Sequence, residues 1–261
     1  MHPVLIDLGF YKIPTYGFLL IIGVGLGLWL ASRRAAAVGV PGDKVFDLGT
    51  WVVLWGLAGG KLALVITEPR HLSSFDGLIG LVRAGGVFYG GLIAALVAAA
   101  VLFRRYHLPL LPVVDVLAPS VALGHAFGRL GCFSAGCCYG AACDEPWAVT
   151  FTHPLAAEIS GTPLNIPLHP VQLYEAAFNF ANWLLLEWLF RRRLPAGSVL
   201  GGYLVTYGVG RFVIELFRGD PDRGFVFGGA LSTSQAIAAV MVPAGVALLF
   251  LARARAKSAR G

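Results

Sequence analysis

Arginines and carboxylates stand at helical spacing within an apolar stretch near the end of the chain. In "TYGVGRFVIELFRGDPDRG", Tyr207, Arg211, Glu215 and Arg218 follow one another at i, i+4, i+8 and i+11. This spacing places all four side chains on one face of a helix. An Arg211–Glu215 ion pair would lower the cost of burying both charges, and Arg218 would leave an excess of positive charge. The pattern indicates a functional cationic site; the alternative is an ion pair that only joins two helices.

A second cationic motif is "GHAFGRLGCF", in which His125 and Arg129 lie four residues apart. A guanidinium can grip a phosphate through two parallel hydrogen bonds, and glycines such as Gly128 allow close approach. Arg129 is therefore a candidate ligand for an anionic head group. Arg211 and Arg218 would join it from another helix. His125 either holds a proton or only packs.

Polar side chains also follow one face of the segment "HPVQLYEAAFNFANW". Gln172, Glu175, Asn179 and Asn182 are separated by three, four and three residues, and His169 precedes the proline that begins the helix. His169, Gln172 and Glu175 either line a wet cavity or supply hydrogen bonds between helices. For Asn179 and Asn182 we expect interhelical hydrogen bonding.

Two tyrosines begin apolar segments. Tyr16 opens the first of them, a position typical of the aromatic belt of a membrane protein. Tyr89 has glycines on both sides in "GGVFYGGLIAA". Because glycine permits close backbone approach, we expect Tyr89 to face a tightly packed interior. There it either has a functional role or only contributes to packing.

The four cysteines have the spacing C-x4-CC-x4-C, from Cys132 to Cys143. Zinc sites usually contain C-x2–4-C pairs, and the adjacent Cys137 and Cys138 are expected to project in different directions. We therefore expect no metal site. One or two disulfides would fit an oxidising compartment, and a nucleophilic thiol is less favoured than a disulfide or an inert cysteine.

The composition predicts an integral membrane protein. Of the 261 residues, 57% are hydrophobic and 13% charged, whereas a soluble domain has about 25% charged and 45–50% apolar residues. The mean hydropathy of +0.75 agrees. The apolar segments fill the chain evenly, so we expect one membrane domain over residues 1–261 and no large soluble domain.

A membrane span needs about 20 mostly apolar residues, and seven segments qualify, which predicts an all-α polytopic bundle. They are Tyr16–Ser32, Val45–Thr67, Val87–Phe103, Leu110–Gly131, Val171–Phe190, Val199–Phe217 and Ser234–Ala252. The longest connection, residues 132–170, contains no Lys or Arg. It is expected to form a small extracytoplasmic head between the fourth and fifth spans.

Basic residues predict the orientation, because cytoplasmic loops carry an excess of Lys and Arg. The richer side holds Arg33, Arg34, Lys44, Arg104, Arg105, Arg191, Arg192, Arg193, Arg253, Arg255, Lys257 and Arg260; the other holds Lys12, Arg70, Arg83, Arg218 and Arg223. The N-terminus is therefore expected outside and the C-terminus in the cytoplasm. The basic tail "ARARAKSARG" fits this rule, so no nucleic-acid partner is expected. The N-terminal segment lacks a basic n-region, and no cleaved signal peptide is expected.

Five blocks together carry a family resemblance: "YGFLL", "FYGGLIAA", "GRLGCFSAGCCYG", "HPVQLYEA" and "YGVGRFVIELFRGDPD". In this order they resemble the bacterial phosphatidylglycerol–prolipoprotein diacylglyceryl transferases over nearly the whole chain. The resemblance implies a bacterial plasma (inner) membrane enzyme that moves a diacylglyceryl group from phosphatidylglycerol to the lipobox cysteine of preprolipoprotein signal peptides. A thioether forms and glycerol-1-phosphate leaves. No metal or cofactor is implied, and the partners are these substrates and membrane lipids.

The resemblance also implies roles for the residues above. Arg129 would hold the lipid phosphate, Arg211 would stabilise the leaving phosphate, and Glu215 and Arg218 would organise that face. Tyr16 matches the essential tyrosine of the family. The remaining matched positions, in the fifth-span block, are His169, Gln172 and Glu175.

The chain departs from the family pattern at three positions. Many members have a histidine, the proposed base, where this chain has Tyr89, and asparagines in place of Cys132 and Ala135. The base could then be Tyr89, His125 or no protein group, and an unperturbed tyrosine is a poor base at neutral pH. The alternatives to a transferase are a small-anion transporter and a non-catalytic lipid-binding paralogue. A transporter would predict inverted repeats or broken helices, and the sequence displays neither.

Overall fold

The structure is a computed structural model that describes residues 2–9, 12–69, 77, 80–81, 86–220 and 223–258. The chain divides into two compact units, one made of Met1–Leu30 and Val114–Gly261 and the other of Ala31–Val113. Arg70, Arg83 and Arg260, which contribute to the predicted orientation, lie outside the described residues.

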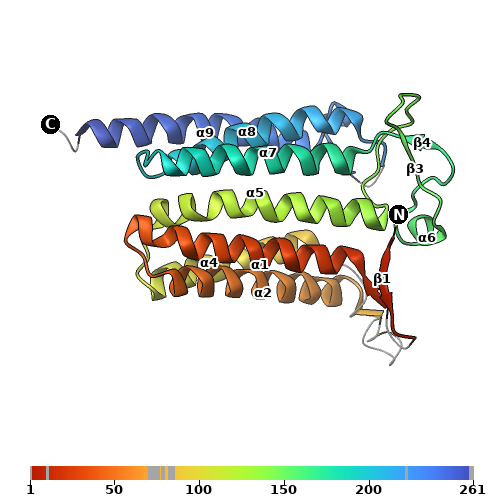
Figure 1. Cartoon of the computed structure of the whole chain (residues 1–261), viewed down its shortest axis with the longest axis horizontal. Helices are drawn as coiled ribbons and strands as arrows, with labels where there is room; N and C mark the ends of the chain where they lie inside the picture. Colours follow the sequence, from red (N-terminus) through yellow and green to blue (C-terminus); the bar gives the residue numbers. More distant parts are fainter. Residues whose placement is uncertain are drawn as a thin grey trace. The chain divides into compact units, whose positions relative to one another are not determined.

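The larger unit consists of long helices (Figure 1). These helices approach one another closely at glycines. Its helices are α1 (Thr15–Ala35, as far as Leu30), α5 (Leu110–Ala135, from Val114), α7 (Val171–Arg191), α8 (Ser198–Ile214) and α9 (Thr233–Ser258). A Cβ on Gly23 of α1 would lie 2.5 Å from Phe127 Cβ of α5. A Cβ on Gly245 of α9 would lie 2.8 Å from the Gly201 carbonyl oxygen of α8. Glycine at these positions lets the helices approach without a steric clash.

Hydrogen bonds from buried polar residues fix how these helices meet. Both Asp115 carboxylate oxygens accept backbone N–H groups at the start of α8, from Gly197 at 2.6 Å and Leu200 at 2.7 Å. The carboxylate thus caps donors that a helix N-terminus leaves unpaired. Thr206 Oγ1 donates to Asn182 Oδ1 at 2.8 Å, which confirms the interhelical bonding predicted for Asn182. Asn179 instead donates within its own helix, to the Glu175 carbonyl oxygen.

Short elements gather at one end of the larger unit. They are β1 (Val4–Asp7), β2 (Lys12–Pro14), β3 (Val149–Thr150), α6 (Pro154–Ser160), β4 (Pro167–Leu168), η3 (Glu215–Phe217), β5 (Phe225–Val226), η5 (Phe227–Gly229) and β6 (Leu231–Ser232). The strands pair antiparallel as β1–β2, β3–β4 and β5–β6. Tyr139, Phe151 and Leu168 form a buried cluster within residues 132–170. The segment predicted as a head therefore has a small core of its own, and β3, β4 and α6 lie opposite the C-terminal end of α9 (Figure 1).

The smaller unit pairs α2 (Gly42–Thr67) with α4 (Phe88–Arg105), after the short helix η1 (Ala36–Val38). A Cβ on Gly59 would lie 2.2 Å from Ala94 Cβ, and one on Gly90 would lie 2.3 Å from Ala63 Cβ. The glycines beside Tyr89 thus bring α4 onto α2. Tyr89 itself is 58% exposed, so the expectation that it faces a packed interior is wrong.

The helices coincide with the predicted apolar segments to within a few residues. Among the described residues, five helices are long and apolar enough to cross a membrane: α1, α2, α5, α8 continued through η3, and α9. The chain is thus all-α with several apolar helices, as expected for a multi-pass membrane protein. The α4 and α7 helices are not among the five, and seven spans remain a prediction.

Candidate active site

The centre of the site is Glu175, which is 1% exposed on α7 and brings three helices together. Its Oε2 atom lies 3.0 Å from Arg129 Nε of α5. Its Oε1 atom lies 3.5 Å from His125 Nε2 of α5 and 3.9 Å from Arg211 Nε of α8. A buried carboxylate needs such cationic partners, because an unpaired buried charge is costly. The predicted i, i+4 pair His125 and Arg129 therefore shares one carboxylate.

A second carboxylate on the same site is Glu215, in the 3-10 turn η3 that follows α8. It forms an ion pair with Arg211, as the sequence predicted. Arg218 Nη1 lies 3.9 Å from Glu215 Oε2. The α-helix ends at Ile214, so Arg218 is reached through the turn and not along a continuous helical face. Arg211 also donates from Nη2 to Ser234 Oγ of α9 at 2.9 Å.

Arg218 has a carboxylate partner of its own. Its Nε atom donates to Asp220 Oδ1 at 2.8 Å, and its Nη2 atom bonds Asp220 Oδ2. Burial opposes the charged form, but the bonds to Asp220 outweigh this and raise the pKa of Arg218 above its usual value. The guanidinium therefore stays charged at every physiological pH.

Arg223 is a member of the site that the sequence analysis did not select. Its Nη1 atom donates to the Glu215 carbonyl oxygen at 3.1 Å, and its guanidinium lies 4.9 Å from the Phe225 ring centroid. The signal that could have found it is the charge-rich sequence "RGDPDRG", which follows the Arg211–Glu215 face directly. Within the described part of the chain, the site contains four guanidinium groups and three carboxylates, from Arg129, Arg211, Arg218, Arg223, Glu175, Glu215 and Asp220.

Tyrosines border the arginines. The Tyr207 ring lies 5.3 Å from the His125 ring. A Cβ on Gly131 would lie 2.9 Å from Tyr16 Cδ2, so Tyr16 packs on α5 two residues beyond Arg129. Arg129, together with three of the cysteines, interacts electrostatically with the Tyr16 hydroxyl. The structure therefore brings Tyr16 to the site, whereas Tyr89 belongs to the smaller unit and its role stays a prediction.

Backbone pairing attaches the loop after α5 to the turn after α8. The Ala141 N–H donates to the Phe217 carbonyl oxygen at 2.9 Å, and the Gly219 N–H donates to the Tyr139 carbonyl oxygen at 3.2 Å. A Cβ on Gly140 would lie 2.3 Å from the His169 carbonyl oxygen. Only glycine fits at this point, where three chain segments meet.

Gln172 and His169 hold this region together, and neither contacts an arginine in a described interaction. Gln172 is fully buried and its Nε2 atom donates to the Cys137 carbonyl oxygen at 2.8 Å. His169 Nδ1 lies 3.2 Å from the Tyr174 hydroxyl, and the His169 ring lies 5.3 Å from the Phe217 ring. These contacts favour a structural role for both residues over one in lining a cavity.

The cysteines are arranged differently from the expectation. All four are free thiols, and the sulfur atoms of Cys132, Cys137 and Cys138 all lie within 4.8 Å of one another. Cys137 and Cys138 therefore do not diverge, because positive φ angles at Gly136 (87°) and Cys138 (58°) turn the chain back. Hydrogen bonds from the Cys132 and Cys137 thiols, with the charges of Arg129 and Arg218, lower the pKa of Cys138.

The site offers fixed positive charge in a largely buried setting, with Arg129 the most accessible of the three paired arginines. Its side chain is 15% exposed, against 7% for Arg211 and 9% for Arg218. Among the described residues of the site, four cations face three carboxylates, so one positive charge is in excess. Such a site suits a singly charged anion such as a phosphate diester.

Comparison with known proteins places the chain in a family. Residues 3–251 match the family model described as prolipoprotein diacylglyceryl transferase. The phosphatidylglycerol–prolipoprotein diacylglyceryl transferase of Clostridium tetani is 34% identical, over 98% of this chain and 99% of the relative. Relatives of the same description from Clostridium perfringens and Azotobacter vinelandii are each 32% identical, over 96% and 95% of this chain and 95% and 93% of their own. The chain belongs to the prolipoprotein diacylglyceryl transferase family.

Proposed function

We propose that the protein transfers the diacylglyceryl group of phosphatidylglycerol to the lipobox cysteine of a prolipoprotein. The deprotonated cysteine sulfur attacks the carbon of the diacylglyceryl group that is bonded to the phosphate. A thioether forms as this carbon–oxygen bond breaks, and glycerol-1-phosphate leaves. The observation that carries the proposal is the convergence of Arg129 and Arg211 on one buried carboxylate in a member of this family.

The leaving group determines what the protein must supply. A phosphate diester carries one negative charge, and expelling it as a monoester adds a second during the reaction. Cations that are fixed in advance stabilise this charge more in the transition state than in the ground state. Arg129, the most exposed of the three paired arginines, would contact the phosphate, and Arg211 and Arg218 would supply the surrounding positive potential.

Glu175 has a positioning role in this mechanism. A carboxylate would repel the phosphate, yet Glu175 is fully covered and its oxygens face Arg129 Nε, Arg211 Nε and His125 Nε2. Holding Arg129 by its Nε side orients the guanidinium and leaves its terminal nitrogens for an anion. The preorganised arginine then does not have to be ordered during the reaction.

The attacking sulfur belongs to the prolipoprotein and not to this chain. The positive charge of the arginine cluster would lower the pKa of an incoming thiol, as neighbouring cations do. The substrate peptide would reach the site at the end of the helices where residues 132–170 pack. This end is proposed to be extracytoplasmic, in the plasma (inner) membrane of a bacterium, with the C-terminus in the cytoplasm.

A small-anion transporter is the second candidate from the sequence, and one further candidate is a lipid-binding protein without activity. An assay that detects products separates all three. Purified protein in phosphatidylglycerol vesicles, given a synthetic lipobox peptide, is expected to convert it to a peptide heavier by the diacylglyceryl group. One mole of glycerol-1-phosphate should be released for each mole of modified peptide. Anion flux without either product would refute the transferase, as would lipid binding without either product.

A further inference from the structure

We infer that Cys132, Cys137 and Cys138 form a binding site for Zn²⁺ with one open coordination position. The three sulfur atoms lie within 4.8 Å of one another, and tetrahedral zinc–thiolate sites have Zn–S bonds of about 2.3 Å. Three thiolates at this separation can therefore bind one ion with only small side-chain movement. Thiolates select soft cations over Mg²⁺ or Ca²⁺.

The backbone that carries the three sulfurs is held by buried side chains from other segments. Thr162 Oγ1 donates to the Gly136 carbonyl oxygen at 2.8 Å, and Gln172 Nε2 donates to the Cys137 carbonyl oxygen at 2.8 Å. The Gly136 N–H also donates to the Cys132 carbonyl oxygen at 2.8 Å, which closes the end of α5. The ligands are thus preorganised, and little conformational entropy is lost when an ion binds.

The charges around the cluster favour occupation. Three thiolates and Zn²⁺ together carry one negative charge. Arg129 interacts electrostatically with Cys132 and Cys138, and Arg218 interacts with Cys138. These guanidinium groups would stabilise the anionic complex that forms when the ion binds.

Among the described residues, three ligands gather at the site, and their number and exposure indicate an open position. Structural zinc sites are closed by four protein ligands, whereas zinc with three protein ligands keeps a fourth place for water or substrate. Cys143, the fourth cysteine, is buried and is not part of the cluster. The three ligands are each only partly buried, so a small group can reach the ion.

The identity of the fourth ligand is the one part of this inference that rests on the proposed function. A thiol that binds zinc loses its proton, here to solvent water, and is held as a thiolate. The lipobox cysteine of the substrate is such a thiol. Zinc at this position would deliver the nucleophile beside Arg129, the proposed phosphate ligand.

Metal binding is tested directly with Co²⁺ as a spectroscopic probe. The full-length protein in detergent is reduced, freed of metal with a chelator, and titrated with Co²⁺ and then with Zn²⁺. We expect thiolate-to-cobalt charge-transfer absorption that saturates at one ion per chain and is abolished by Zn²⁺. Cys138→Ser and Cys132→Ser should each weaken binding by at least the roughly 100-fold that loss of a metal's outer-shell partner can cost. Cys143→Ser is the matched control and should bind as the unchanged protein does.

Two results would overturn the metal site: absence of the charge-transfer band, or equal bands in the Cys138→Ser and unchanged proteins of equal thermal stability. Mass spectrometry that finds a disulfide between any two of Cys132, Cys137 and Cys138, in place of metal binding, would also overturn it. The fourth ligand is tested by adding a lipobox peptide to the cobalt protein. A shift of the cobalt bands with the Cys peptide and not with its Ser counterpart is expected, and unchanged bands would refute this part. The transfer assay is a separate readout, so failure of the proposed function is distinguishable from failure of the metal site.

Discussion

At the residue scale, the arrangement of charges around Glu175 explains how three largely buried arginines are tolerated in an apolar protein. Charges within a bilayer are costly, and they are found where they pair with one another. Glu175 shares its two oxygens among Arg129, Arg211 and His125, while Glu215 and Asp220 hold the remaining paired cations. Each carboxylate thus lowers the free-energy cost of burying an arginine and fixes where its guanidinium lies.

Glu175→Gln should reduce both transfer and stability. The substitution keeps the side-chain volume but leaves Arg129 and Arg211 without their shared charge, and removing one partner of a buried pair costs about 3–5 kcal/mol. We expect a lower midpoint of thermal unfolding in detergent and at least about a tenfold slower transfer. Glu158→Gln, at an exposed position of α6, is the control and should change neither. A Glu175→Gln protein with the original rate would show that this carboxylate positions nothing that the reaction needs.

The sequence predicted the local pairs of the site but not the contacts between distant segments. His125 with Arg129, and Arg211 with Glu215, are four residues apart, so helical geometry alone brings them together. Nothing in the spacing of Glu175 says which helix it faces, because that depends on how α7 packs against α5 and α8. The prediction that Cys137 and Cys138 project in different directions was wrong for a similar reason, because the convergence of the sulfurs depends on positive φ angles at Gly136 and Cys138.

At the element scale, the contact between α7 and α8 aligns Glu175 with Arg211. A Cβ on Gly210 of α8 would lie 2.1 Å from the Phe178 ring of α7. The aromatic ring therefore occupies the space that glycine leaves on the facing helix. The residue after this contact is Arg211, so the spacing of the two helices sets the geometry of the ion pair.

Gly210→Ala should force α7 and α8 apart. Overpacking of this kind typically costs about 1–3 kcal/mol, and we expect a lower unfolding temperature together with slower transfer. The double variant Gly210→Ala with Phe178→Leu should regain much of the unfolding temperature and of the transfer rate. The reason is that the ring atoms closest to the new methyl group are removed. Gly25→Ala in α1 is the matched control, since a Cβ there meets no atom within 4 Å. No rescue in the double variant, with Gly210→Ala still impaired, would contradict this assignment.

The elements themselves were largely predictable, because runs of about 20 apolar residues have few alternatives to a helix in a membrane. The bounds of α2 and α5 follow the predicted segments closely. The environment of Tyr89 was not predictable, since glycines on both sides of a residue say that one face is packed but not that Tyr89 itself is on that face. The polar side chains on one face of α7 are likewise explained only by the segments that contact them.

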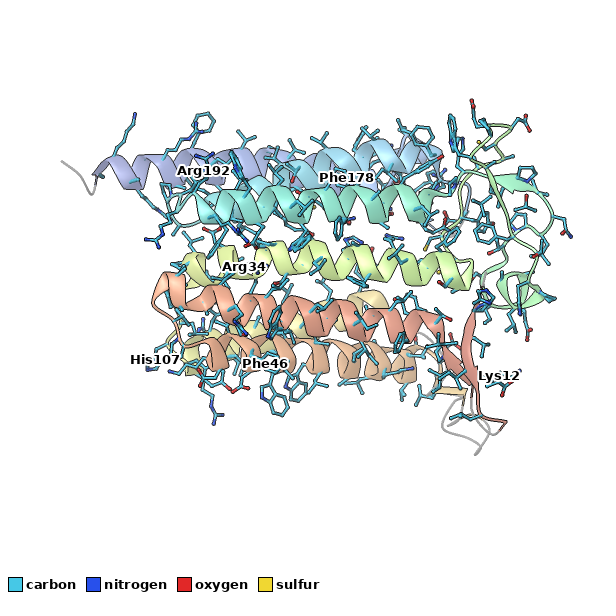
Figure 2. The ribbon with its side chains drawn as sticks, in the orientation of Figure 1. Lys12, Arg34, Phe46, His107, Phe178 and Arg192 are labelled. Atoms are coloured by element: carbon cyan, nitrogen blue, oxygen red, sulfur yellow. The ribbon has the colours of Figure 1, made fainter. Side chains whose placement is uncertain are left out.

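At the scale of the whole molecule, charge distinguishes the two ends of the larger unit. Arg192 lies at the end of α7 remote from β3, β4 and α6 (Figure 2). The C-terminal end of α9, which carries Arg253, Arg255 and Lys257, lies at that same end (Figure 1). A cluster of basic residues beyond a membrane span is retained in the cytoplasm.

We therefore predict that a C-terminal fusion faces the cytoplasm. Alkaline phosphatase, which is active only after export, should be inactive when fused after the last residue, whereas green fluorescent protein at the same place should fluoresce. Phosphatase inserted after Gly161, in the turn that follows α6, should be active. The opposite pattern at the two positions would show that the orientation is reversed and that the arginine site lies near the cytoplasmic face of the membrane.

The claim that unites these scales is that a preorganised Arg129 stabilises the phosphate that leaves when the thioether forms. Its most direct test is the initial rate of thioether formation by Arg129→Gln in phosphatidylglycerol vesicles, with Arg105→Gln of α4 as the control. We predict a decrease of about 100-fold or more for Arg129→Gln, the size expected when one preorganised donor to a developing oxyanion is removed. The control should keep the original rate. An Arg129→Gln protein that forms the thioether as fast as the unchanged chain would contradict the account.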